Sequence, residues 1–166
     1  SVLALDRALQ QGLNVVLLAN LYDRDVHRVR FHGVRHELIR AQARAIGLEA
    51  RVVPTTPEAF EAVFLDLLTK LKATGITGMI FGNIHIAEVR AWYETRVRDA
   101  GLDHREPLWG QSPVELSREV VTRGFKTLIV SGDLTLGAAD LVGRELDHEL
   151  LQEIGRRPHE IGRAHV

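Results

Sequence analysis

The chain has 166 residues, of which 45% are hydrophobic and 26% charged, so it is long enough and apolar enough to bury the core of one globular domain. Its formal net charge of -1 excludes the basic field that attracts nucleic acid or anionic membranes. It contains no cysteine, which excludes disulfides, thiolate zinc sites and a cysteine nucleophile, and no apolar run approaches the roughly 20 residues of a membrane span. We therefore expect a cytoplasmic protein.

The elements alternate along the chain. Apolar residues at helical spacing predict an opening helix that ends near Gly12. Four short apolar runs without polar alternation predict strands buried on both faces, over residues 14–19, 50–53, 78–81 and 127–130. Helices are expected over 32–46, 57–73, 86–100 and 112–123, each ending near a glycine, and over 138–154, where Gly143 interrupts the pattern. This order predicts an α/β fold with a parallel sheet.

Small and polar residues follow the predicted strands. In an open parallel sheet, ligands bind outside the carboxyl ends of the strands. Asn20 lies after the first strand, Gly82 and Asn83 after the third, and the segment 131–133 after the fourth. The same residue types dominate ordinary turns, so this pattern leaves ligand contact and a plain loop equally open.

Two histidine patterns have competing interpretations. His32 and His36 stand four residues apart on a predicted helix, a spacing that suits a metal ion, but no third ligand lies near them in sequence and a solvated helix face is favoured. His85 follows the third strand and is a candidate site residue. His27, His104, His148 and His159 lie among polar residues and are expected at the surface.

Several segments in series resemble the successive blocks of the diphthine-ammonia ligase family, which are adenine-nucleotide alpha hydrolases of the PP-loop ATP pyrophosphatase group. The resemblance runs from Ser1 to about Leu151 and lies in the order and spacing of the blocks. The segments are FHGVRHELIRAQARAIGL, FGNIHIAEVRAWYETRV, PLWGQSPVELSREVVTRGF and LVGREL.

This resemblance implies a Rossmann-like HUP fold, with helices on both faces of a parallel sheet. Family members begin with a strand and the phosphate-binding loop Ser-Gly-Gly-x-Asp-Ser, and by this resemblance Ser1 is the last residue of that loop. The central first strand would then be missing between the strands at 14–19 and 78–81. Its loss should leave these two strands unpaired on facing edges or force them together in a distorted sheet. We expect one domain over residues 1–159, and a tail over 160–166 that resembles a translated sequencing adapter.

The resemblance also implies a reaction. ATP and Mg²⁺ would bind, a carboxylate would attack the α-phosphorus to release pyrophosphate, and ammonia would displace AMP to give an amide. The acceptor is diphthine on elongation factor 2 in archaeal and eukaryotic relatives, and a small metabolite is the alternative in bacteria. A homodimer is compatible with this reading, nucleic acid and membrane are not expected as partners, and the fragment by itself is expected to be inactive.

Site residues follow from matching family positions. The nucleotide side would include Ser1, Ala19, Asn20, Leu21, His32, Gly82 and Asn83. The substrate side would include Arg90, Glu94, Trp109 and Gly110. The family commonly has aspartate where this chain has Asn83, which places any role of that carboxylate in question. The spacing of Arg90 and Glu94 also fits a plain helix salt bridge, and Trp109 also fits core packing.

Two other readings share the fold. One is a module related to universal stress proteins that holds ATP without turnover, which the amide at Asn83 mildly favours. The other is a different PP-loop ligase or thiolase, although the absence of cysteine argues against sulfur transfer within this stretch.

Overall fold

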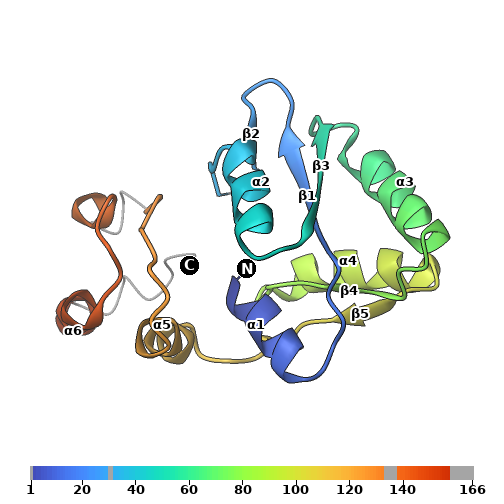
Figure 1. The fold of residues 1–166 in the computed structure, drawn as a ribbon. Helices are drawn as coiled ribbons and strands as arrows, with labels where there is room; N and C mark the ends of the chain where they lie inside the picture. The colour runs from blue at the N-terminus through green and yellow to red at the C-terminus, as the bar shows by residue number, and fades with distance from the viewer. Residues whose placement is uncertain (1, 30–31, 133–137, 158–166) are drawn as a thin grey trace. The chain divides into compact units, whose positions relative to one another are not determined.

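The computed structural model describes residues 2–29, 32–132 and 138–157. The chain divides into two compact units, residues 1–109 and 110–166, which are described separately below (Figure 1). The expectation of a single domain over residues 1–159 stays a prediction. Ser1, Asp133 and His159, which the sequence analysis singled out, lie outside the described residues, as does the predicted tail over 160–166.

The first unit contains a three-stranded sheet in the order β2-β1-β3. Strand β1 (Leu17–Asp23) pairs in parallel with β3 (Glu49–Thr55) along its whole length, and its last two residues pair antiparallel with β2 (Arg28–Val29). The predicted strand over 14–19 therefore ends too early. Register explains the difference, because seven consecutive residues of β1 find partners in β3 and the polar end of the strand is included.

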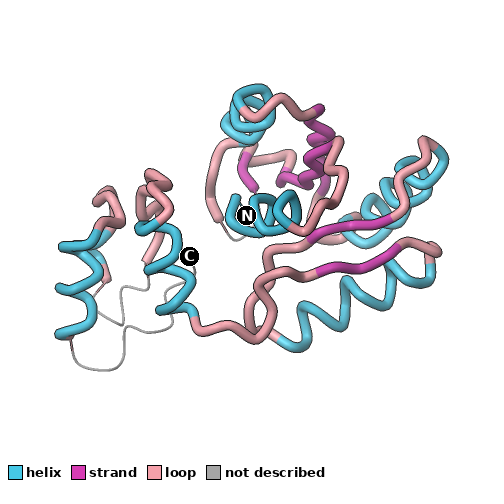
Figure 2. Tube along the Cα trace, turned by 60° about the horizontal axis from the view of Figure 1, so that its bottom comes forward, coloured by secondary structure: helices cyan, strands magenta, loops and turns pink. Residues whose placement is uncertain are grey.

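A second sheet contains two parallel strands, β4 (Gly78–Ile80) and β5 (Asp103–Arg105), which run side by side in Figure 2. The backbones approach so closely that a Cβ at Gly78 would lie 2.9 Å from the Cβ of Asp103 and 3.0 Å from its carbonyl oxygen. Only glycine fits this contact without displacing β5. The sequence analysis missed β2 and β5, since two or three residues give too short a pattern to detect.

Strands β1 and β4 belong to different sheets and do not pair, which is one of the two outcomes that the resemblance led us to expect. Among the described residues there is no continuous five-stranded sheet. The parallel pairs β1–β3 and β4–β5 are each joined by a helix-containing crossover, so the unit has the α/β architecture with small parallel sheets that the sequence predicted.

Four helices accompany these strands in the first unit (Figure 1). The predicted glycine stops are confirmed, because the residues after the helices have φ between 71° and 88°, where a side chain would be strained. In each case the residue after the glycine donates its N–H back to the last full turn of the helix. The helices are α1 (Val2–Gln10), α2 (His36–Ala45), α3 (Phe60–Ala73) and α4 (Ala87–Asp99).

A hydrophobic cluster joins α3 and α4 to both sheets. Leu68 and Val97 are fully buried at its centre, and Leu21 of β1 and Met79 of β4 pack against it. Trp92, Tyr93 and Phe81 add ring contacts with centroids 4.8–5.5 Å apart within this core. The cluster fixes the position of β4 and β5, and therefore of the residues that follow them.

The second unit contains α5 (Pro113–Thr122), the short 3₁₀ helix η2 (Ala139–Leu141) and α6 (His148–Arg156). The predicted strand over 127–130 is wrong, since only Leu128 forms an isolated bridge, to Glu145. The predicted helix over 138–154 is also wrong as one element, because Gly143 has a φ of 88° and the chain turns before α6 begins. Leu141, Leu146 and Leu150 form the core of this unit.

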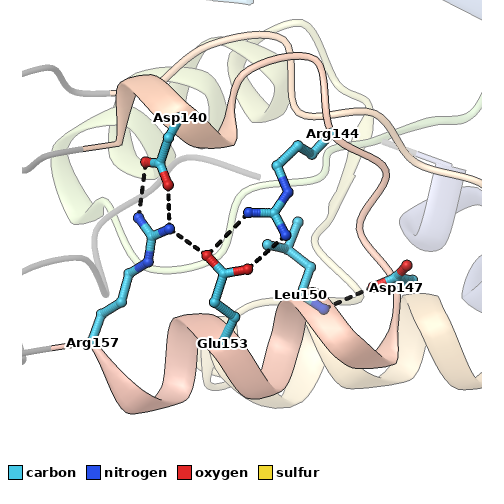
Figure 3. A network of polar contacts seen from close by, with 6 residues as sticks. All are labelled: Asp140, Arg144, Asp147, Leu150, Glu153 and Arg157. Carbon is cyan, nitrogen blue, oxygen red and sulfur yellow. Dashed lines mark hydrogen bonds and ion pairs between the residues drawn. The ribbon is translucent and has the colours of Figure 1, made fainter.

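Ion pairs connect η2 to α6 (Figure 3). Glu153 of α6 accepts two hydrogen bonds from Arg144, at 3.0 and 2.6 Å, and one from Arg157 at 2.5 Å. Arg157 also pairs with Asp140 of η2. The Asp147 side chain caps α6 by accepting a hydrogen bond from the Leu150 N–H at 2.8 Å. The ion-paired side chains are called the η2–α6 network below; they are Asp140, Arg144, Glu153 and Arg157.

Candidate active site

A polar cluster lies where β4 and β5 end. It combines residues that follow these two strands with residues on the first turns of α4, and it belongs entirely to the first unit. We call it the Glu106 cluster, after the carboxylate that most of its members contact. Its members are Asn83, Arg90, Glu94, His104, Glu106 and Trp109.

Local backbone geometry brings these residues together. Glu106 directly follows β5, and the Phe81 N–H beyond β4 donates to the Arg105 carbonyl at 2.9 Å, which continues the pairing of the two strands. Asn83 lies two residues further on. After Glu106 the chain turns at once, with Pro107 as the second residue of the turn and the Trp109 N–H donating to the Glu106 carbonyl at 3.2 Å. Parallel pairing thus places Asn83, Glu106 and Trp109 at one edge of the sheet.

The Glu106 carboxylate is the centre of the cluster. Its side chain is only 2% exposed. Oε1 accepts a hydrogen bond from Asn83 Nδ2 at 2.7 Å, and Oε2 lies 3.3 Å from Arg90 Nε. That second contact is an ion pair without hydrogen-bond geometry, so Oε2 is a buried oxygen that receives no hydrogen bond. A buried carboxylate in this condition is costly for folding, which makes it a candidate functional group.

Arg90 contacts three members of the cluster. Its Nε lies 3.3 Å from Glu94 Oε2, in the salt bridge that their spacing allows, and 3.3 Å from Glu106 Oε2. Its guanidinium carbon lies 4.6 Å from the centre of the Trp109 ring. The Arg90 side chain keeps 33% of its surface exposed. Of the two alternatives for Arg90 and Glu94, the structure shows the salt bridge, and the exposed part of Arg90 still allows contact with a ligand.

His104 lies in β5 with a side chain that is 2% exposed, so the expectation that it lies at the surface is wrong. The charged neighbours Asp103 and Arg105 point out of the strand by alternation and concealed the burial of the residue between them. Its Nε2 is 3.4 Å from Glu106 Oε1 without a hydrogen bond, and its ring stacks on Phe81. Burial lowers the pKa of His104, which keeps the imidazole neutral beside the Glu106 carboxylate.

The nucleotide-side residues Ala19, Asn20 and Leu21 lie inside β1 and not in a loop after it. Leu21 packs against the hydrophobic core. The Oδ1 atom of Asn20 is buried and receives no hydrogen bond, so β1 presents one unsatisfied acceptor. In the Glu106 cluster, such atoms belong to Glu106 and His104, which the sequence analysis did not name as site residues.

The predicted metal pair does not form on one helix, because α2 begins at His36 and His32 lies before it, exposed. His36 instead stacks on Tyr22 with ring centroids 4.2 Å apart. Within residues 2–29, 32–132 and 138–157, no group of three acidic or histidine side chains is arranged to hold a metal ion. Gly82 and His85 lie in the segment between β4 and α4, and Gly110 has a φ of 75° after the Glu106–Trp109 turn.

The sequence analysis found four members of the Glu106 cluster and missed two. Asn83, Arg90, Glu94 and Trp109 were named through the family resemblance, and the structure brings them together around one carboxylate. Glu106 and His104 were missed. Residues 103–106 are all polar, so no apolar–polar alternation indicated a strand or a buried side chain in this segment.

Comparison with known proteins identifies a family for the chain. Residues 1–104 match the model of the diphthamide synthase N-terminal domain, and this range includes Asn83, Arg90, Glu94 and His104. A search of curated proteins gave no match. None of the helices in the described part of the chain combines the length and apolar character needed to cross a membrane. Since the match covers more than half of the sequence, the chain belongs to the diphthamide synthase family.

Proposed function

We propose that this chain is part of an ATP-dependent amide ligase that activates a carboxylate and transfers ammonia to it, as a diphthine-ammonia ligase does. The match of residues 1–104 to the diphthamide synthase N-terminal domain carries this proposal. The buried polar cluster at the ends of β4 and β5 supports it, because this edge of a parallel sheet is where α/β enzymes bind their substrates.

ATP would lie along α1 and β1. The N-terminal end of α1 carries the positive end of the helix dipole, which favours an anionic group such as phosphate. The buried acceptor Asn20 Oδ1 fits a hydrogen-bond donor such as the amino group of adenine, and Ala19 and Leu21 flank it in β1. His32 and Gly82 complete the proposed nucleotide side. ATP supplies the AMP group that activates the carboxylate, with pyrophosphate as the leaving group.

Mg²⁺ would depend mainly on oxygen atoms that ATP and water provide. Magnesium commonly keeps several waters and binds one or two carboxylates together with substrate phosphates. The described residues offer no three-ligand group, which fits a metal that arrives with the nucleotide and does not fit a dedicated protein cage.

The acceptor carboxylate would bind at the exposed side of Arg90. A guanidinium is suited to carboxylates, and Trp109 below it and Glu94 beside it fix its orientation. We propose the same acceptor classes that the resemblance implied, a diphthine-like protein side chain or a small carboxylate metabolite, with ammonia as the second substrate and Gly110 adjoining the site. A cytoplasmic location and the absence of nucleic-acid and membrane partners remain part of this proposal, and a homodimer is compatible with it.

One observation favours a second candidate, a module that binds ATP without turnover. Position 83 is an amide and Arg90 already lies beside two carboxylates, so the cluster contains no free carboxylate on the β4 loop and no unpaired cation. A binding module would retain ATP affinity and lack carboxylate activation.

Pyrophosphate exchange separates the two candidates. We expect the protein, expressed with the sequence that surrounds it in its gene, to transfer label from pyrophosphate into ATP only when a carboxylate acceptor is present. Arg90→Gln should reduce exchange about tenfold or more, because one charge-assisted contact to the acceptor is lost. The matched control is Lys70→Gln, which also removes one positive charge, since Lys70 is 66% exposed and pairs with Asp66 on α3. ATP binding without exchange for any carboxylate would favour the non-catalytic module.

A further inference from the structure

The contact between Asn83 and Glu106 determines what Asn83 can offer to a ligand. An asparagine amide has one side that donates, Nδ2, and one that accepts, Oδ1. Nδ2 is committed to the buried Glu106 carboxylate at 2.7 Å, because a carboxylate accepts and cannot donate. Asn83 therefore directs Oδ1 away from Glu106, where its partner is a hydrogen-bond donor or a cation and not another acceptor.

This polarity selects among the substrates of the proposed reaction. ATP phosphates and an acceptor carboxylate carry only acceptor oxygens and would repel Asn83 Oδ1. Ammonia has N–H donors. The neighbours of Glu106 agree with a site for a neutral donor, because burial lowers the pKa of His104 and keeps its imidazole neutral, and Glu106 Oε2, 3.3 Å from Arg90, is a buried acceptor without a hydrogen bond.

We propose that Glu106 is a positioning residue that fixes the amide of Asn83 so that Asn83 Oδ1 receives an N–H of the ammonia substrate. Glu106 touches no reacting atom in this arrangement and acts through Asn83. The identity of the ligand rests on the proposed function, whereas the orientation of Asn83 rests on the contacts of Glu106 alone.

Two substitutions and their combination test the inference. Glu106→Gln keeps the shape of the side chain but allows both polarities of an amide–amide pair, so Asn83 is no longer fixed. Asn83→Asp places two carboxylates at hydrogen-bond distance. In Asn83→Asp/Glu106→Gln, the new glutamine amide donates to one oxygen of the new aspartate and leaves its other oxygen as an acceptor, which restores the original polarity.

The catalytic readout compares two steps of one reaction. Pyrophosphate exchange needs ATP and the carboxylate but no ammonia, while amide formation needs all three. Because Glu106 also pairs with Arg90, Glu106→Gln should change exchange to a smaller extent, but it should raise the KM for ammonium about tenfold, the effect of misplacing one hydrogen-bond acceptor. The double variant should recover to within about threefold of the wild-type KM. Glu88→Gln, an exposed residue on α4, is the matched control.

A readout without ligand keeps the inference independent of the proposed function. In Asn83→Asp, repulsion between the carboxylates at positions 83 and 106 raises the pKa of the pair. The urea midpoint of this variant should therefore fall relative to that of wild type as the pH rises from 5 to 8. The double variant Asn83→Asp/Glu106→Gln should not show that fall. Asn14→Asp adds the same charge at an exposed position and should show no such dependence. If Asn83→Asp fails to fold, the side-chain NH₂ resonances of Asn83 in Glu106→Gln should still shift away from their wild-type positions.

Each experiment has a result that would overturn one part of the proposal. Equal pH profiles for Asn83→Asp and Asn14→Asp, or unmoved Asn83 NH₂ resonances in Glu106→Gln, would overturn the fixed orientation of Asn83. A change in exchange with an unchanged KM for ammonium would overturn the assignment of ammonia. Absence of exchange in the wild type would defeat the proposed function and the ammonia assignment together, and the pH profile would then decide the Glu106–Asn83 contact by itself.

Discussion

The Glu106 cluster and the η2–α6 network use the same residue types in opposite ways. In the network, Glu153 receives three hydrogen bonds from two arginines, and its side chain is 39% exposed, so water shares the charge (Figure 3). In the cluster, Glu106 is 2% exposed and receives one hydrogen bond, from a neutral amide. The first arrangement connects two helices. The second leaves polar atoms buried and unsatisfied, which a purely structural contact has no reason to do.

We expect the largest effect on this contrast from removing the arginine that pairs with Glu106. Arg90→Gln leaves the buried Glu106 carboxylate without an opposite charge, and we expect the first unit to lose about 3 kcal/mol of unfolding free energy. Tryptophan fluorescence in urea measures the loss, because Trp92 and Trp109 both lie in that unit.

Arg98→Gln is the matched control, since Arg98 is 67% exposed and pairs with Glu94 only at the surface. It should cost less than about 1 kcal/mol. Equal losses of unfolding free energy in Arg90→Gln and Arg98→Gln would mean that water solvates the Glu106 carboxylate.

A smaller change in the free energy of unfolding is expected from the titration of His104. Burial lowers its pKa below the ordinary 6.5, so the unfolded chain binds this proton more readily than the folded one. Its contribution to stability is full above about pH 6.5 and falls as the pH drops below that value. His104→Phe keeps the stacking on Phe81 but has no proton to bind, so the loss of stability at low pH that His104 causes should disappear in this variant. Urea midpoints at pH 7.5 and 5.5 check it, and an identical decline in both proteins would contradict it.

The smallest effect is expected in the η2–α6 network, where the charges are exposed. Hydrogen bonds from Arg144 and Arg157 lower the pKa of Glu153 from 4.5 to about 2. The stabilisation is therefore complete above about pH 4.5 and is lost as the pH falls towards 2. The protection factors of the Leu150 and Leu151 amides against hydrogen exchange should fall over this range in wild type and much less in Glu153→Gln. High salt should weaken the wild-type protection.

Sequence alone predicted what depends on local chemistry. The glycine stops were found because a positive φ after a helix nearly requires that residue, and the α/β class followed from the apolar runs. The end of β1, the burial of His104 and the role of Glu106 depend on pairing with residues 23 to 32 positions away, and no local pattern encodes such contacts. Asn83 was recognised as a site position through its family, whereas the polarity of its amide became visible only with Glu106 in place.

The close approach of β4 and β5 at Gly78 has a consequence for genetics. Asp103, which faces Gly78 across the two strands, begins the short strand β5, and Glu106 directly follows that strand. Any side chain at position 78 would displace this strand, and the carboxylate at its end would move with it. In a mutational screen for activity, Gly78 should therefore group with Asn83 and Arg90, although it carries no functional group and contacts no ligand.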